Sequence, residues 1–354
     1  MKKKGFEMQF HWVFILIAGA IILAFFFSLV QKQRALSEEK LSITLATDME
    51  AVFSGAIESK GTAQPLVIPR TGIAFSCSQA CECNFVIGKK ATEFRDKILF
   101  APSLLSGQNA VAWAQELKMP FRVANFLYLT NPNIKYYLVY EASNQDSLKL
   151  YRIISDALPQ GLNLESIDST GKVKGLKAGG FQETKFVFLD ITSDVESVLV
   201  GLDRSFRKEK VSAVLVQPAS KLVSFFEKEN SNSLEFSKSL SVFIGEPSIF
   251  AAIFSSDSQM YECGMRSAFS RLSHVAQIIY ERAQKLQDEM QLQNRTECIY
   301  LLDSLESIKE SSNQIVSAPL IYEKIQDVNN IVSQEEALER ENRNIIQLSC
   351  PEIY

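Results

Sequence analysis

The sequence has very little histidine: His11 and His274 are the only two among 354 residues. Catalytic triads and multi-histidine metal sites need imidazoles beside other polar groups, and this chain offers almost none. His11 lies at the edge of an apolar run, where an amphipathic ring is ordinary. His274 lies in a segment with helical spacing, which favours a surface role. We therefore predict that the protein is not an enzyme.

Other binding signatures are also missing. Lys and Arg number 37 against 41 Asp and Glu, and a net charge of −4 argues against a protein that coats nucleic acid. Gly171-Lys172 is followed by Val173, where a phosphate-binding loop needs Ser or Thr. The glycines within 175–180 lack the spacing of a dinucleotide-binding loop. We expect no cofactor and no nucleic-acid partner.

What the chain does have is an apolar run from Phe10 to Val30, in which 18 of 21 residues are apolar. As a helix it would span roughly 31 Å, about the thickness of a bilayer core. The alternative is a buried helix of a soluble protein, but the run has no polar face. We predict a transmembrane helix over residues 10–30, with the lipid bilayer as its partner, after a cytoplasmic segment over residues 1–9.

The flanks of the run bear on processing and orientation. The run is longer than the apolar core of a cleaved secretory signal, and no small-x-small site follows it, so we expect an uncleaved anchor. Three lysines at positions 2–4 precede it, and Lys32, Arg34 and Lys40 follow it. The positive-inside rule favours a cytoplasmic N-terminus by a small margin. We expect a single-pass cell-membrane protein with the bulk of the chain extracytoplasmic.

The next segment has the pattern of an amphipathic helix. Met49, Val52, Phe53 and Ala56 recur at intervals of three or four residues, and residues 31–54 contain neither Pro nor Gly. We predict that the helix continues as an amphipathic stalk over residues 31–60 and packs on a head domain.

The first residues, KKKGFE over positions 2–7, directly precede the apolar run. This arrangement resembles the class III signal of type IV prepilins, in which a peptidase cuts after the small residue and leaves the apolar helix attached. The resemblance implies processing after Gly5. The family usually carries Glu at mature position five, where this chain has Phe10. The alternative is that the lysines only determine topology. In layout, the chain resembles uncharacterised single-pass membrane-anchored surface proteins of archaea.

The rest of the chain predicts an α/β (α+β) head with a mixed sheet and a helical tail. Short strand candidates at 72–76, 85–88, 97–101 and 121–130 indicate a β-rich subdomain over residues 61–134, with 110–118 readable as strand or helix. Apolar strands alternating with helices over 135–247 predict an α/β domain with a partly parallel sheet covered on both faces. Residues 248–354 predict a tail of two or three helices.

Within the α/β domain, Asp190 ends the apolar strand 185–191, and ligands often bind at strand ends in such folds. Asp194 follows closely, before a helix predicted over 193–208. We take Asp190 and Asp194 as a candidate ligand site, with helix capping by Asp194 as the alternative.

All six cysteines follow the apolar run: Cys77, Cys81, Cys83, Cys263, Cys298 and Cys350. If this part lies outside the cytoplasm, disulfides are favoured. We expect one bridge within the C-x3-C-x-C cluster and one among the last three cysteines. Free buried thiols and a zinc site are the alternatives. Three clustered thiolates suit zinc, but the fourth ligand would have to come from far along the chain, so we assign no metal site.

These features predict a non-enzymatic, membrane-anchored extracytoplasmic protein. We expect it to be a structural or assembly component of the cell envelope, pilin-like or secretion-associated, with protein partners in the envelope. The alternative is a membrane-tethered sensor domain that binds a ligand or a partner.

Overall fold

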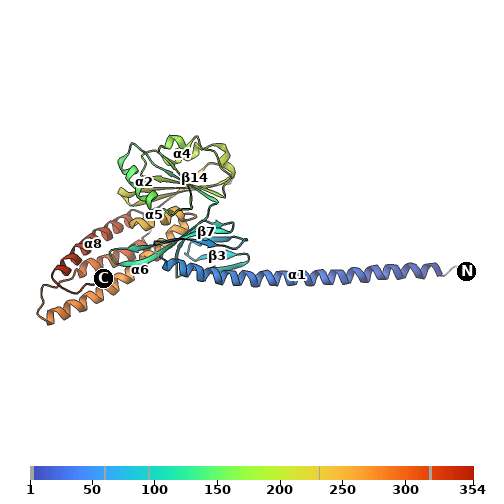
Figure 1. The fold of residues 1–354 in the computed structure, drawn as a ribbon, viewed down its shortest axis with the longest axis horizontal. Helices are drawn as coiled ribbons and strands as arrows, with labels where there is room; N and C mark the ends of the chain where they lie inside the picture. The colour runs from blue at the N-terminus through green and yellow to red at the C-terminus, as the bar shows by residue number, and fades with distance from the viewer. Residues whose placement is uncertain (1–3, 60, 95, 231, 319–320) are drawn as a thin grey trace.

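The fold is described from a computed structural model covering residues 4–59, 61–94, 96–230, 232–318 and 321–354, with side chains from residue 12 onward except 34–36. The lysines at positions 2 and 3 lie outside these residues, and at Gly5 only the backbone is described. A long N-terminal helix leads into a head with several mixed sheets, and three long helices project from it (Figure 1). This confirms the predicted mixed α/β fold with an N-terminal helix and C-terminal helices.

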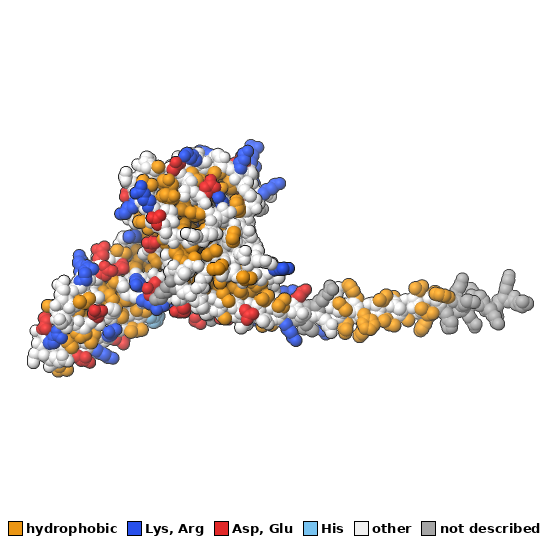
Figure 2. Space-filling view, viewed as in Figure 1, with side chains coloured by type: hydrophobic (Ala, Val, Ile, Leu, Met, Phe, Trp, Pro, Cys, Tyr) orange, Lys and Arg blue, Asp and Glu red, His pale blue; other side chains and the backbone are white. Residues whose placement is uncertain are grey.

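The N-terminal helix α1 runs unbroken from Lys4 to Glu58. Its first part extends away from the head, and its large apolar side chains between Trp12 and Val30 are 45–72% exposed. Figure 2 shows this stretch carrying hydrophobic side chains. The helix is long and apolar enough to cross a membrane. Its last turns are different, because Met49 and Phe53 are buried inside the head.

The end of α1 packs against a β-rich subdomain of two four-stranded sheets. The first sheet has the order β1 (Ala63–Val67), β7 (Asn109–Lys118), β8 (Arg122–Thr130) and β5 (Ile98–Phe100). The second has the order β4 (Lys90–Glu93), β3 (Cys83–Ile87), β2 (Ile73–Cys77) and β6 (Leu104–Leu105). One hydrophobic core joins both sheets to α1, and in it the rings of Phe53 and Phe85 lie 5.5 Å apart.

Residues 110–118, which the sequence pattern allows as either helix or strand, lie in strand β7. Alternate residues of β7 face different cores: Ala112 and Ala114 face α1, whereas Trp113 and Leu117 face the other side. This period of two is that of a strand buried on both faces.

The α/β domain contains a six-stranded sheet. Its order is β10 (Asn163–Ile167), β9 (Ile134–Val139), β11 (Glu183–Leu189), β12 (Lys210–Gln217), β13 (Leu222–Lys228) and β14 (Phe236–Val242). The first four strands are parallel, and the last two pair antiparallel. Helix α2 (Gln145–Ala157) packs against one face, and α4 (Val195–Val200) packs against the other. The partly parallel, doubly covered sheet is therefore as predicted.

The helix predicted over 193–208 is wrong, because the structure divides it into α4 and a 3-10 helix, η1 (Arg204–Lys208). The helix α4 ends at Gly201, and the Asp203 carboxylate accepts a hydrogen bond from the Ser205 N–H, which starts η1. A short helix α3 (Thr170–Val173) and a 3-10 turn η2 (Pro218–Ser220) complete this domain.

The tail consists of α5 (Gly245–Phe254), α6 (Ser258–Leu292), α7 (Leu302–Ser317) and α8 (Ile321–Gln347). Helices α5 and α6 are separate, and the Asp257 carboxylate caps α6 by accepting from the Met260 N–H at 2.8 Å. Helix α5 is buried against β7 and β8. Helices α6, α7 and α8 pack side by side in series and project from the head (Figure 1).

One buried cation gives the core a pH dependence. Lys185 lies inside β11, and its ammonium donates to the Ser255 carbonyl. Burial lowers the pKa of Lys185 from 10.5 to about 8. The nearby Lys210 ammonium lowers this pKa further. Three carboxylates act in the opposite direction and raise it: those of Glu183, Asp257 and Glu227.

We expect Lys185→Met to flatten the pH dependence of stability. Between pH 8 and 10.5 the unfolded chain binds more protons at Lys185 than the folded chain, so wild-type stability rises with pH. The two pKa values imply a differential contribution of about 3 kcal/mol across this window. Denaturant unfolding of both proteins at several pH values measures it. Parallel pH profiles would contradict the prediction, whatever the absolute stability of the variant.

Candidate functional site

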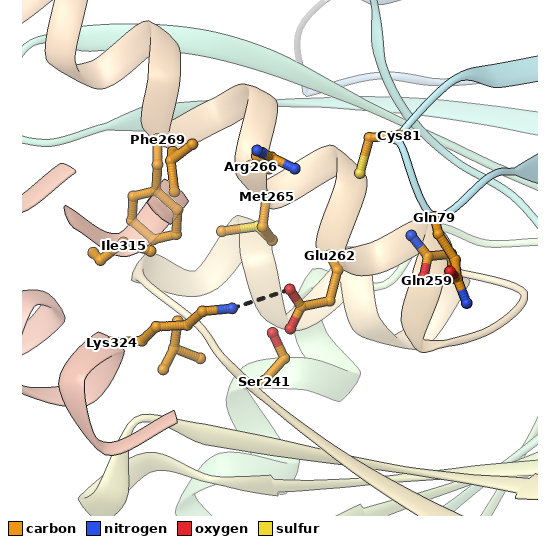
Figure 3. Close-up of a pocket in the computed structure, with 12 residues that line it drawn as sticks. Gln79, Cys81, Ser241, Gln259, Glu262, Met265, Arg266, Phe269, Ile315 and Lys324 are labelled. Atoms are coloured by element: carbon orange, nitrogen blue, oxygen red, sulfur yellow. Dashed lines mark hydrogen bonds and ion pairs between the residues drawn. The ribbon is translucent and has the colours of Figure 1, made fainter. Parts of the chain in front are cut away.

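A cavity of about 310 Å³ lies where the β2–β3 loop, the end of β14 and helices α6, α7 and α8 meet (Figure 3). Helix α6 supplies one wall, because Gln259, Glu262, Arg266 and Phe269 recur at intervals of three or four residues and share a face. Residues far apart in the sequence therefore converge on one hollow of the size that holds a small ligand.

The cavity combines charge with an apolar wall. The Lys324 ammonium reaches from α8 to the Glu262 carboxylate, at 3.2 Å, as Figure 3 shows. Arg266 adds a further positive charge, while Phe269 and Ile315 are buried behind it. With Glu262 paired to Lys324, the guanidinium gives this group of three a net positive charge. The site suits a small molecule with an anionic group and an apolar part.

One disulfide of the protein lies at the rim of this cavity. The structure forms three disulfides: Cys77–Cys83, Cys81–Cys263 and Cys298–Cys350. The second ties the β2–β3 loop to α6, and Cys81 lines the cavity. The Gln259 side-chain amide donates to the Ser78 carbonyl and to the Cys263 sulfur, each at 3.1 Å, so it also holds the loop against the helix.

The structure separates the two predicted carboxylates. Asp194 caps α4, where its carboxylate accepts from the hydroxyl and from the N–H of Ser197, and these hydrogen bonds, the hydroxyl's first, lower its pKa. Asp190 lies at the end of β11 with φ +47° and lines a cavity of about 340 Å³ with Asp146 and Lys149 beside α2. Burial, followed by the charge of Asp146, raises the pKa of Asp190. Because α2 and α4 cover opposite faces of the sheet, the pair does not form one site.

A polar group that the sequence analysis missed lies at the carboxyl end of the parallel strands. Glu141 follows β9, and its carboxylate accepts from the hydroxyls of Thr192 and Ser193 at 3.0 and 2.8 Å. Burial raises the pKa of Glu141, but the hydrogen bonds outweigh it and the net shift is downward. Asp168 and Glu141 line a cavity of about 460 Å³.

Glu141 lies beside a switch point of the sheet, between β9 and β11, while the residues that line the 460 Å³ cavity follow β9 and β10. From β9 the chain adds β10 on one side and then crosses to add β11 on the other, so the strand order reverses there. Open parallel sheets bind ligands at such switch points. A strand-order argument could have pointed to Glu141, but the sequence alone does not say on which side of β9 each later strand lies.

No family model matches this chain, and neither a curated protein nor a solved structure does. The protein is therefore classified by its own fold and disulfides. It is a disulfide-bonded, mixed α/β protein with an N-terminal helix long and apolar enough to cross a membrane.

Proposed function

We propose that this protein is a non-enzymatic, single-pass membrane protein of the cell envelope. Its N-terminus lies in the cytoplasm, and its head lies outside. It acts as a structural or assembly component, pilin-like or secretion-associated, through protein partners in the envelope. The observation that carries this proposal is helix α1, which continues without a break from an exposed apolar stretch into the core of the head.

This continuity has a mechanical meaning. An anchor joined to its head by a flexible linker leaves the orientation of the head free. Here Ala46, Met49, Phe53 and Ala56 bury one stripe of α1 in the core, so the head is held rigidly on the same helix. A rigid anchor suits a subunit that must present its head in a defined geometry to neighbours.

The disulfides support an external head. All six cysteines are paired, and disulfides persist in oxidising compartments while the cytosol keeps thiols reduced. The lysines at positions 2–4 before the apolar run agree with this orientation.

We expect the mature protein to begin at Phe6. A prepilin-type peptidase would cut after Gly5 and leave the rest of α1 intact. Mass spectrometry of the N-terminal peptide from membranes measures this directly. A start at Met1 or Lys2 would contradict processing and would leave the anchor role standing.

The topology is tested with a surface thiol. Leu292 is 85% exposed at the end of α6, so Leu292→Cys places a reactive cysteine on the head. We expect a membrane-impermeant maleimide to label this variant on intact cells. Wild type should stay unlabelled until an impermeant reductant opens its disulfides. Labelling of Leu292→Cys only after lysis would place the head in the cytoplasm and overturn the proposal.

The second candidate is a membrane-tethered sensor that binds a ligand or a partner. The cavity lined by Glu262, Arg266 and Lys324 favours it. A small anionic molecule that raises the melting temperature of the wild-type chain, but not of Arg266→Gln, would support this function over assembly.

A further inference from the structure

Four of the six cysteine sulfurs meet in one place. The sulfurs of Cys77, Cys83 and Cys263 all lie within 4.8 Å of one another. The sulfur of Cys81 is bonded to that of Cys263 at 2.10 Å. Three of these residues come from the β2–β3 hairpin and one comes from α6. The C-x3-C-x-C cluster has three sulfurs. The fold brings a fourth to it from Cys263, which lies 182 residues after Cys81.

This spacing is close to that of a tetrathiolate zinc site. With zinc–sulfur bonds of about 2.3 Å, the sulfurs of a tetrahedral site lie about 3.8 Å apart. The sulfurs of Cys77, Cys83 and Cys263 lie within 4.8 Å of one another, so their distances exceed this spacing by about 1 Å at most. The fold thus places three sulfurs near this spacing, and the fourth, that of Cys81, is bonded to one of them.

The surroundings also suit a small cation with an anionic ligand shell. A cavity of about 30 Å³ lies against Cys81, Cys83 and Cys263, which is room for one ion or one water. Lys97 lines the same cavity with a side chain 14% exposed, and its ammonium forms an ion pair with Glu50 at 3.5 Å. The Gln259 amide donates to the Cys263 sulfur, as outer-shell donors do at metal sites.

We propose that the reduced form of this cluster binds one Zn²⁺ through Cys77, Cys81, Cys83 and Cys263. Two molecules of a dithiol reduce the two disulfides; each gives two electrons and two protons and becomes a cyclic disulfide. The four thiols then release four protons as Zn²⁺ binds four thiolates. Zinc in this way replaces the two disulfides as the link between the hairpin and α6. This inference does not depend on the proposed envelope function.

The choice of zinc follows from the ligands. Four thiolates form a closed structural site with no open position for a substrate. Soft sulfur ligands in a tetrahedral arrangement select zinc over magnesium or calcium, which require oxygen. The site would therefore be structural, and it would operate where disulfides are reduced.

The experiment uses the full chain carrying Cys298→Ser and Cys350→Ser, which leaves only the four clustered cysteines. The protein is reduced with dithiothreitol, freed of reductant and titrated with Co²⁺, whose thiolate complexes absorb strongly. We expect one equivalent to bind and Zn²⁺ to displace it, whereas the unreduced protein should bind none. Zn²⁺ should also restore the melting temperature that reduction lowers, since the metal binds the folded chain.

The matched control adds Cys263→Ser to this background. We expect Co²⁺ to bind it more than about tenfold more weakly, because even the loss of an outer-shell partner costs 10–100-fold. Equal affinity would mean that the hairpin binds metal as a local peptide, which overturns a site made by the fold. Binding of less than one equivalent of Co²⁺ to the reduced protein would also overturn the proposed site. A reduced chain that unfolds and stays unfolded with Zn²⁺ would do the same.

Discussion

Replacing Cys81 and Cys263 together by Ala lowers the free energy of unfolding by about 5 kcal/mol, the largest loss we expect from any single cross-link of this protein. The reason is the 182-residue separation of these cysteines. A long loop closed in the unfolded chain removes much of its conformational entropy, and losing the bridge restores that entropy to the unfolded state.

The other two disulfides provide graded controls. The Cys77–Cys83 bridge closes a loop with a separation of only 6, so its removal should cost about 2 kcal/mol. The Cys298–Cys350 bridge, with a separation of 52, should fall between them at about 4 kcal/mol. Denaturant unfolding of the three double variants measures this order. A loss for Cys81/Cys263 no larger than that for Cys77/Cys83 would contradict the argument from loop length.

Phe53→Ala destabilises the head by about 3–5 kcal/mol, the range for deleting a buried aromatic ring. Phe53 is 1% exposed and meets the rings of Phe85 and Phe75 at 5.5 and 6.2 Å. The cavity left behind would open between α1 and both sheets of the β-rich subdomain, so the helix should loosen from the head.

The matched control lies on the same helix. Phe26 is 56% exposed in the apolar stretch, so Phe26→Ala should leave the unfolding of the head unchanged in detergent. Thermal unfolding in micelles compares the two variants. Equal melting temperatures for Phe53→Ala and wild type would mean that α1 is not part of the core of the head.

Local patterns were enough to predict much of this fold. The stripe through Met49 and Phe53 predicts the packed end of α1, because a helix repeats its faces every three to four residues. The apolar segment 211–217 indicates a buried strand, and it lies in β12, which pairs parallel with β11 and antiparallel with β13. The segment 110–118 could not be decided, because both faces of β7 are buried and its alanines also favour a helix.

The candidate site was less accessible to sequence reasoning, because tertiary structure assembles it. Asp190 lies at a strand end, which the sequence pattern predicts, but its neighbour Asp146 comes from a helix on one face of the sheet. The ion pair joins Glu262 of α6 to Lys324 of α8, two residues 62 apart in the sequence. No local period marks such contacts, since they depend on how helices pack after they form.

The Cys81–Cys263 bridge also determines how the molecule carries a pulling force. Tension applied between the N-terminal helix and the helical tail passes from the β2–β3 loop straight into α6 through a covalent bond. The residues between these two cysteines, including the entire six-stranded sheet, lie off this load path. Fully extended, they would add about 600 Å to the chain. The bridge prevents this segment from being pulled out, so the six-stranded sheet and its two cavities can stay folded while the N-terminal helix is under tension.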